Sequence, residues 1–225
     1  MSIIARDLEK LKESLSEMWG TAISQINYSS EALLDNNKEL AQKVILREKG
    51  LDAMEVLIDE RCEELIALYS PVAVDLRFIL STLRINNNLE RIGDFAFGIA
   101  KFSLKVANLN LEADLIEELR ISEMFSRLLE MMKSAKQSFL TEDVELAEDV
   151  IKQDDYLNQI KNASKDIVEQ YIKSNSDRIY ECLRLQGVIR KLERAGDHCV
   201  NIAEEIIFYI DAKIVKHKKA QQPNG

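Results

Sequence analysis

The chain has 225 residues, a formal net charge of −9, and only seven glycines and two prolines. Abundant charged residues and few chain breakers predict an all-α protein with a hydrophobic core. The acidic balance argues against nucleic acid as a partner. Because no apolar run reaches membrane-spanning length or forms a signal-peptide core, we expect a cytoplasmic protein without direct membrane insertion, which reaches the inner face of the membrane only through partners.

Apolar residues recur at helical spacing along the whole chain. They predict six long helices, at residues 2–34, 38–69, 71–106, 112–140, 143–173 and 177–215. Ser70 and Pro71 are typical of an N-cap and a first helical position, so we expect the third helix to begin there. Because the breaks between helices are short, helices adjacent in sequence should pack antiparallel, as in helical bundles.

One hexapeptide occurs twice in the chain. Leu-Glu-Arg-Ile-Gly-Asp at 89–94 returns as Leu-Glu-Arg-Ala-Gly-Asp at 192–197, which is 103 positions later. Apolar residues of the first two helices also recur, at an offset of 106. We therefore predict two tandem three-helix bundles with a pseudo-twofold relation, in domains 1–109 and 110–215, followed by a basic, disordered tail at 216–225. Each unit is too small to bury much surface alone, so the two should share an interface.

Each copy of the hexapeptide carries two carboxylates four residues apart, Glu90 with Asp94 and Glu193 with Asp197. Residues so spaced lie above one another on a helix, and their charges repel unless a cation lies between them. On a helical wheel both pairs fall away from the apolar seam, so we expect them to point outward or sideways. The glycine in each copy is unfavourable inside a helix and indicates a close approach by a neighbouring helix.

A further acidic stripe lies on the second predicted helix, where four residues are spaced 4, 3 and 4: Glu48, Asp52, Glu55 and Asp59. The matching positions of the fifth helix hold fewer acids, and Asp155 adjoins the first of them: Asp154, Asn158, Lys161 and Lys165. If the second and third helices of each unit pack antiparallel, their carboxylates meet. Such oxygen-rich clusters suit hard cations such as Mg, Ca, Mn or iron in its harder states.

The two lysines predict a weaker or different metal site in the second unit. The alternative for both units is a solvated helix face whose acids form ion pairs, and Arg91 and Arg194 are neighbouring cations. Spacing alone favours the solvated helix face over metal binding. The tandem recurrence of the acids with glycine strengthens the case for metal binding without reversing this preference.

Motifs for nucleotide binding or catalysis are missing from the sequence. It contains no G-x-x-x-x-G-K-[ST] loop, no G-x-S-x-G elbow and no Glu-x-x-His pair of the ferritin-like kind. His198 and His217 have no second histidine near in sequence. The three cysteines, Cys62, Cys182 and Cys199, lack CxxC spacing, so we expect reduced packing residues and neither a disulfide framework nor a zinc site.

The repeated hexapeptide, extended in its second copy to Leu192–Ala203, resembles the signature of the PhoU family. Asp75-Leu76-Arg77 and Met54–Glu60 are similar to the first repeat of that family. The resemblance covers nearly the whole chain and implies two tandem three-helix bundles. It also implies restraint of the phosphate-starvation response, through association with the ATPase subunit of the phosphate ABC transporter and with a sensor histidine kinase.

The resemblance further implies metal ions, as multinuclear iron or zinc clusters in some family members and as Mg or Mn in others. Carried over, Glu90 and Asp94 with the acids from Glu48 to Asp59 would form one site. The other site would use Glu193 and Asp197 with Asp154 and Asp155. Three positions depart from the family pattern: Phe95 stands where histidine is common, Gly98 where asparagine is common, and Asn158 replaces an acid in the fifth helix.

Three functions remain open on the sequence. The leading hypothesis is a non-enzymatic adaptor, acting as a homodimer, that couples phosphate transport to kinase output. The first alternative is a metal-dependent enzyme acting on a phosphorylated ligand, and the second is a purely structural helical adaptor. The lack of a nucleophile or general-base constellation favours an adaptor over an enzyme.

Overall fold

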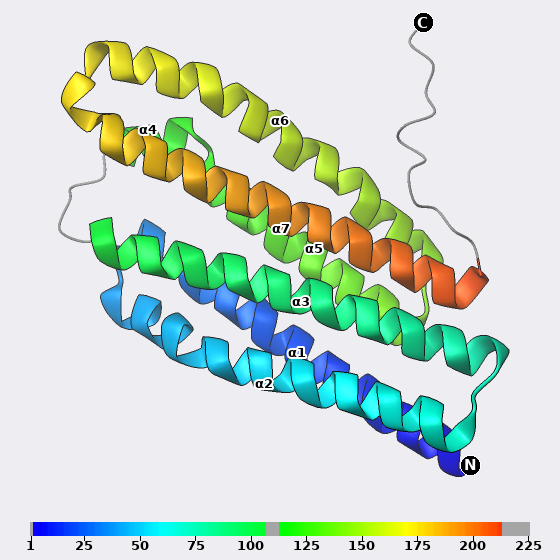
Figure 1. Ribbon diagram of the computed structural model, residues 1–225. Coiled ribbons are helices and arrows are strands. Elements are labelled where there is room, and N and C mark those ends of the chain that lie inside the picture. The colour runs from blue at the N-terminus through cyan, green and yellow to red at the C-terminus, as the bar shows by residue number, and fades with distance from the viewer. Residues whose placement is uncertain (1, 107–112, 213–225) are drawn as a thin grey trace, which may run out of the picture.

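The computed structural model describes residues 2–106 and 113–212, and within them every regular element is a helix (Figure 1). The elements are α1 (Ile3–Leu34), α2 (Lys38–Tyr69), α3 (Ala73–Val106), α4 (Ala113–Glu118), α5 (Ile121–Thr141), α6 (Val144–Ser174), the 3₁₀ turn η1 (Ser176–Arg178) and α7 (Ile179–Asp211). The predicted all-α class is confirmed. None of the helices in these residues has both the length and the apolar content needed to span a bilayer.

The helices form two bundles side by side. α1, α2 and α3 pack on one another, and α5, α6 and α7 do the same, with the short α4 against α5. The bundles meet where α3 packs on α7 and α1 packs on α5. This leaves α2 and α6 on opposite outer sides of the molecule (Figure 1). Two tandem helical bundles, the predicted architecture, are therefore observed.

The two units begin their outer helices in the same way. The side chain of Asn37 accepts a hydrogen bond from the backbone N–H of Leu40 at the start of α2, at 3.1 Å. Asp143, 106 positions later, accepts from the N–H of Leu146 at the start of α6, at 3.0 Å. Such caps satisfy backbone donors that a helix start leaves unpaired, so the repeat extends to the helix ends.

Two predicted helix boundaries are wrong. Ser70 does not cap α3, but ends α2 in the left-handed conformation, with φ 45°, and α3 starts at Ala73. The helical region is disfavoured for a residue that precedes proline, which accounts for the break before Pro71. The predicted helix 112–140 is two helices, because Arg120 is left-handed, with φ 54°, while its guanidinium is held by Glu123 at 2.6 Å.

Some predictions fall on residues outside the described ones. The domain boundary at 109/110 lies between the described ranges, and the tail at 216–225 lies beyond them. Both therefore stay predictions. α7 begins at Ile179, after the η1 turn, two residues later than expected, and is described as far as Asp211.

The predicted interface between the two units is observed, and aromatic side chains form much of it. Trp19 of α1 is fully buried, and its indole N–H donates to the carbonyl of Met132 in α5 at 3.1 Å. Phe139 of α5 lies 5.8 Å from Trp19, 6.1 Å from Phe78 of α3 and 6.0 Å from Tyr209 of α7, between ring centroids. One aromatic cluster thus joins both units, and burial of this much apolar surface is strongly stabilising.

The close approaches predicted at the repeated glycines are also observed. A Cβ placed on Gly93 would lie 2.1 Å from Cδ2 of Leu51 in α2, and one on Gly196 would lie 2.5 Å from Cδ1 of Leu157 in α6. Leu51 and Leu157 are themselves 106 positions apart. Both units therefore use the same leucine-on-glycine contact to bring the outer helix against the inner one beside the carboxylates.

Candidate functional site

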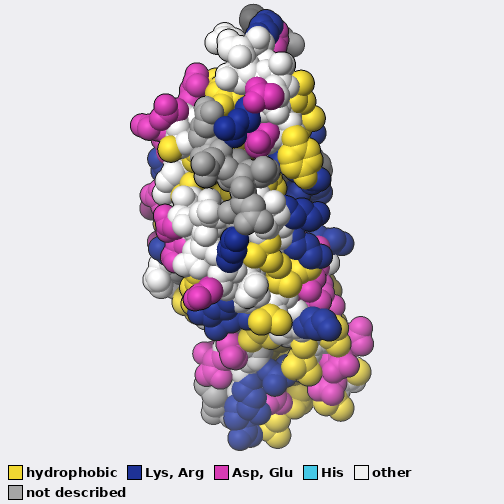
Figure 2. Space-filling view, turned by 90° about the vertical axis from the view of Figure 1, so that its left-hand side faces the viewer, with side chains coloured by type: hydrophobic (Ala, Val, Ile, Leu, Met, Phe, Trp, Pro, Cys, Tyr) yellow, Lys and Arg dark blue, Asp and Glu magenta, His cyan; other side chains and the backbone are white. Residues whose placement is uncertain are grey.

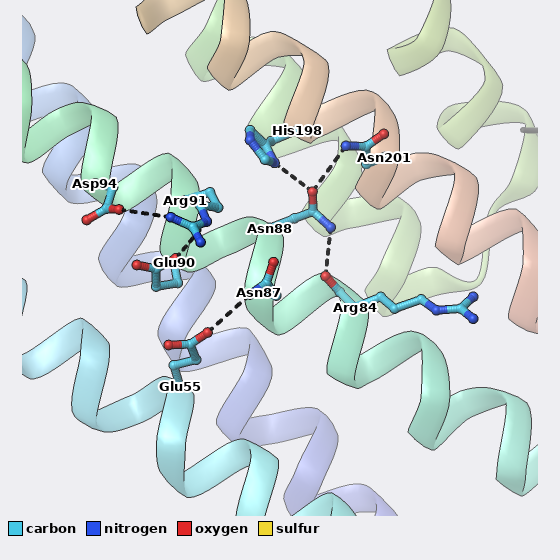
Figure 3. Close-up of polar contacts among 9 residues, drawn as sticks. All are labelled: Glu55, Arg84, Asn87, Asn88, Glu90, Arg91, Asp94, His198 and Asn201. Atoms are coloured by element: carbon cyan, nitrogen blue, oxygen red, sulfur yellow. Dashed lines mark hydrogen bonds and ion pairs between the residues drawn. The ribbon is translucent and has the colours of Figure 1, made fainter. Parts of the chain in front are cut away.

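The structure brings the acids of α2 and α3 together in the first unit. All six predicted side chains are half-buried, and they line facing sides of the two helices: Glu48, Asp52, Glu55 and Asp59 on α2, and Glu90 and Asp94 on α3. Figure 3 shows Glu55 of α2 opposite Glu90 and Asp94 of α3. We call Asp52, Glu55, Asp59, Glu90 and Asp94 the first cluster.

The first cluster carries more negative charge than its own cations balance. Burial, and next the negative charges of Asp94 and Glu55, raise the pKa of Glu90 from 4.5 to about 7. Burial and the charge of Asp59 also raise the pKa of Glu55. Arg91 is the cation near Glu90 and Asp94, but its contacts to their oxygens are long, at 3.5 and 3.6 Å, and its side chain is half exposed. A carboxylate in such surroundings holds its proton more readily.

Asparagine amides support the α2 side of the first cluster. Nδ2 of the buried Asn86 donates to Oδ1 of Asp59 and to the carbonyl of Glu55, both at 2.9 Å. Nδ2 of Asn87 donates to Oε1 of Glu55 at 3.5 Å (Figure 3). Donors of this kind orient carboxylate oxygens without neutralising them, so these amides position the cluster and leave its charge in place.

The second unit replaces this arrangement with an ion pair. Lys161 of α6 lies at the position equivalent to Glu55, and its Nζ is 2.6 Å from Oε1 of Glu193, the equivalent of Glu90. Nδ2 of Asn158 donates to Oδ2 of Asp154 at 2.8 Å. We call Asp154, Asn158, Lys161 and Glu193 the second cluster. An ammonium group of the chain itself thus stands against the carboxylate in the second unit.

The expectation that both carboxylate pairs of the hexapeptides point outward or sideways is wrong for Glu193 of the second unit. Glu193 is 8% exposed and Asp154 only 3%, whereas Asp155 and Asp197 are exposed. The pairing with Lys161 explains why Glu193 can be buried, since a buried charge requires a partner. Because neighbouring residues of a helix point about 100° apart, Asp154 and Asp155 do not share one environment.

The metal assignments are not tested by these contacts. Within residues 2–106 and 113–212, no three side chains of His, Cys, Asp or Glu are grouped as a ready set of metal ligands. The chemistry of the first cluster nevertheless suits a hard cation, because its groups are oxygen donors and the raised pKa of Glu90 reflects charge that a cation would relieve. The second cluster suits one less well, because Lys161 already supplies a positive charge.

The cysteines contribute no evident chemistry. All three are buried and none is in a disulfide. Burial raises the pKa of the Cys62 thiol to about 12, helped by the charge of Asp59. Burial also raises the pKa of Cys199, beside Asp154. Thiols with raised pKa values are poor nucleophiles and poor metal ligands at neutral pH, which agrees with the expected packing role.

A polar network crosses between the two units behind the first cluster (Figure 3). Oδ1 of Asn88 in α3 lies 2.7 Å from Nδ1 of His198 and 3.3 Å from Nδ2 of Asn201, both in α7. Arg84 of α3 pairs at 2.9 Å with Glu205 of α7, which is only 2% exposed. Burial, with the positive charges of Arg194 and Arg91, lowers the pKa of His198. A neutral His198 therefore donates through Nδ1 to the amide oxygen, and the network fixes α3 against α7.

This network was missed by sequence reasoning, although a signal for it existed. Phe95 and Gly98 of the first unit stand at the positions of His198 and Asn201. Phe95 and His198 lie ring to ring, with centroids 5.6 Å apart. Phe95 and His198, which occupy equivalent positions of the two repeats and differ in side chain, thus meet where α3 packs on α7.

The profile of the PhoU domain matches the chain twice, at residues 15–103 and 121–206, and each match contains one carboxylate cluster. The chain belongs to the PhoU family. It is 32% identical over 211 residues to the "Phosphate-specific transport system accessory protein PhoU homolog 1" of Thermotoga maritima, covering 94% of this chain and 90% of that protein. It is 34% identical over 217 residues to the homolog of Aquifex aeolicus, covering 96% of this chain and 97% of that protein.

Solved PhoU structures have the same fold. The crystal structure of PhoU from Pseudomonas aeruginosa superposes with a TM-score of 0.88 at 30% identity, covering 93% of this chain and 99% of that one. PhoU from Streptococcus pneumoniae superposes with a TM-score of 0.83 at 24% identity, over 95% and 99% of the two chains. The tandem bundles described above are therefore the PhoU architecture, and they span nearly the whole length of these relatives.

Proposed function

We propose that this protein is a cytoplasmic, non-enzymatic regulator of phosphate uptake and a negative modulator of phosphate-starvation signalling. The observation that carries the proposal is the match, over more than nine-tenths of the chain, to proteins named as accessory to phosphate-specific transport. The mixed surface suits protein partners better than nucleic acid. In Figure 2 acidic, basic and hydrophobic side chains alternate over the end of the molecule where α2 and α7 begin.

The partners we propose are the ATPase subunit of a phosphate ABC transporter and a sensor histidine kinase. Binding both would let the protein report transport activity to the kinase, and would restrain the kinase while phosphate is plentiful. Deleting the gene should derepress phosphate-starvation genes in phosphate-replete medium, and a plasmid copy should restore repression. Unchanged expression in the deletion strain would favour the structural adaptor or the enzyme instead.

We also propose that the first cluster binds a divalent or trivalent cation, with Glu55, Glu90 and Asp94 among its ligands. Asp52, Asp59 and Glu48 extend the same acidic surface of α2, so a multinuclear iron or zinc cluster, or Mg or Mn, fits the donor set. The bound cation would neutralise the carboxylates and tighten the contact between α2 and α3.

The decisive measurement for the cation is elemental analysis of protein purified without chelator. We expect bound metal to fall sharply when Glu55 and Glu90 are both changed to glutamine. The matched control changes Asp155 and Asp197, exposed acids of the second unit, to asparagine. Protein that holds no metal after purification and takes up none of Mg, Mn, Zn or iron would contradict the proposed cation site and leave the first cluster an ordinary solvated helix face.

A further inference from the structure

The two arginines of the repeated hexapeptide flank a pair of rings at the junction of α3 and α7. These helices run antiparallel (Figure 1), and Phe95 of α3 lies against His198, its equivalent in α7. The guanidinium of Arg194 lies 5.1 Å from the centroid of the Phe95 ring. Arg91 is the equivalent of Arg194, and the charges of both lower the pKa of His198. Both cations are therefore close to the same imidazole (Figure 3 shows Arg91 and His198, one from each helix).

A third cation, Lys191, reaches the same junction because a side chain is missing on the facing helix. Asn88 of α3 meets Asn201 of α7, with Oδ1 and Nδ2 3.3 Å apart. Their equivalents, Lys191 and Gly98, also lie against each other, since a Cβ placed on Gly98 would be 2.7 Å from Cε of Lys191. A larger residue at position 98 would thus displace the lysine. Gly98, one of the positions where the repeats differ, therefore leaves space for a positive charge.

These three cations have little counter-charge of their own. In the part of the chain that the structure describes, neither Lys191 nor Arg194 forms an ion pair with another described residue. The side chain of Arg91 is 54% exposed, and its contacts to the acids of its own hexapeptide are long, at 3.5 and 3.6 Å. Arg84 of the same helix, by contrast, pairs at 2.9 Å with Glu205. Like charges close together repel one another, so a bound anion would stabilise this junction.

We propose that the α3–α7 junction binds a phosphoryl anion, held by Arg91, Lys191 and Arg194. Guanidinium groups bind phosphate oxygens through paired hydrogen bonds, and a lysine ammonium adds a compact positive charge. Arg91 and Arg194 are exposed and Lys191 is half-buried, so these long side chains can converge on one anion beside the ring pair. The inference rests on the proposed function for the choice of phosphate among oxyanions. An anion bound here contacts both units, and it would give the regulator a direct response to phosphate.

Isothermal titration calorimetry with inorganic phosphate tests the binding. We expect saturable binding to the wild type, and about tenfold weaker binding to Arg194→Gln and to Lys191→Gln, since each loses a charge-assisted hydrogen bond. The control Arg127→Gln removes the same charge from α5, where Arg127 pairs with Glu130 at 2.9 Å, and should bind as the wild type does. Circular dichroism checks that each variant is folded. No saturable binding to the wild type, or equal weakening in Arg127→Gln and Arg194→Gln, would overturn the proposal.

Proton NMR tests the location, because the chain has only two histidines. The variant His198→Gln identifies the imidazole resonances of His198, which should shift as inorganic phosphate is added to the wild type at constant pH. Binding without a shift of these resonances would place the anion elsewhere and overturn the proposal.

Titration with ATP distinguishes the two sources of a phosphoryl group. Tighter binding of inorganic phosphate would assign the junction to the free ion, and tighter binding of ATP would assign it to the phosphates of a nucleotide. Binding of poly-glutamate together with no binding of either phosphate compound would assign the three cations to an acidic protein surface and contradict the proposal. The deletion experiment described above does not depend on this junction, so derepression in the deletion strain combined with no phosphate binding would refute the anion site alone.

Discussion

The first and second clusters occupy equivalent places in the two units and differ chiefly in charge. Both lie beside a leucine packed on a glycine, and both flanking outer helices start with a side-chain cap. In the first, burial and the negative charges of Asp94 and Glu55 raise the pKa of Glu90, and in the second, Lys161 pairs with Glu193 at 2.6 Å. The comparison shows that the two units share the packing around the site but not its charge. The backbone and the core are kept, while one residue on the outer helix decides whether the site repels its own charges or neutralises them.

The largest effect should follow from removing the internal cation of the second cluster. Lys161→Met leaves Glu193, 8% exposed, without its partner. Breaking a buried ion pair destabilises by about 3–5 kcal/mol, and because the Lys161 side chain is 30% exposed water reduces the penalty, so we expect about 2–3 kcal/mol by urea unfolding at pH 7. Lys165→Met, an exposed lysine of the same helix, is the control and should change stability by less than about 0.5 kcal/mol.

An unchanged stability in Lys161→Met would mean that Glu193 reaches water or another donor in solution. The second cluster would then resemble the first, and the two clusters would not differ in whether an internal cation neutralises the carboxylate.

The response to metal should separate the clusters next. If the first cluster binds a cation, a hundredfold excess over its dissociation constant stabilises the fold by about 2.7 kcal/mol. Asp94→Asn should abolish more of this stabilisation than Asp197→Asn. Without metal both variants should melt close to the wild type, because Asp94 is half-buried and Asp197 exposed, so both carboxylates can be hydrated.

Melting temperatures with and without Mn, Mg, Zn and iron provide the measurement. Equal losses of metal stabilisation in the two variants would show that Lys161 does not weaken the second site. If no metal changes the melting temperature of the wild type, neither cluster binds a cation.

The all-helical architecture and the facing acids could be predicted because they depend on local periodicity and on the repeat. The spacing of Glu48 to Asp59 placed these acids on one face of α2, and Gly93 indicated a close approach by a neighbouring helix, which the structure shows to be the contact with Leu51. The burial of Glu193 could not be predicted, because it depends on which rotamer Lys161 adopts across two helices. The junction of Asn88 with His198 was also missed, because its contacts depend on how the units dock, and the differences between the repeats at Phe95 and Gly98 only hint at it.

The smallest expected effect, about 1–2 kcal/mol, is the pH-dependent change in the free energy of unfolding when Glu90 or Glu193 is replaced by glutamine. The pKa of Glu90 is raised to about 7 in the folded protein from a reference of 4.5, so the folded state binds more protons than the unfolded state between these values. Stability from this group is therefore present below pH 4.5 and is lost as pH rises to about 7. Because Glu90 is partly hydrated, we expect Glu90→Gln to stabilise the metal-free protein at pH 8 by about 1–2 kcal/mol, and hardly at all at pH 4.5.

The same substitution in the second cluster should have the opposite sign. Glu193→Gln replaces the charged partner of Lys161 with a neutral amide, and should lower the free energy of unfolding at pH 8 by about 1–2 kcal/mol, the usual strength of a hydrogen bond to a charged group. Urea unfolding of both variants and the wild type from pH 4.5 to 8, with chelator present, measures the pair. Opposite signs at pH 8 would establish that Lys161 neutralises one cluster and that the other is left with excess charge. If both variants are destabilised, Arg91 must neutralise Glu90 in solution, because only an uncompensated carboxylate gains from losing its charge.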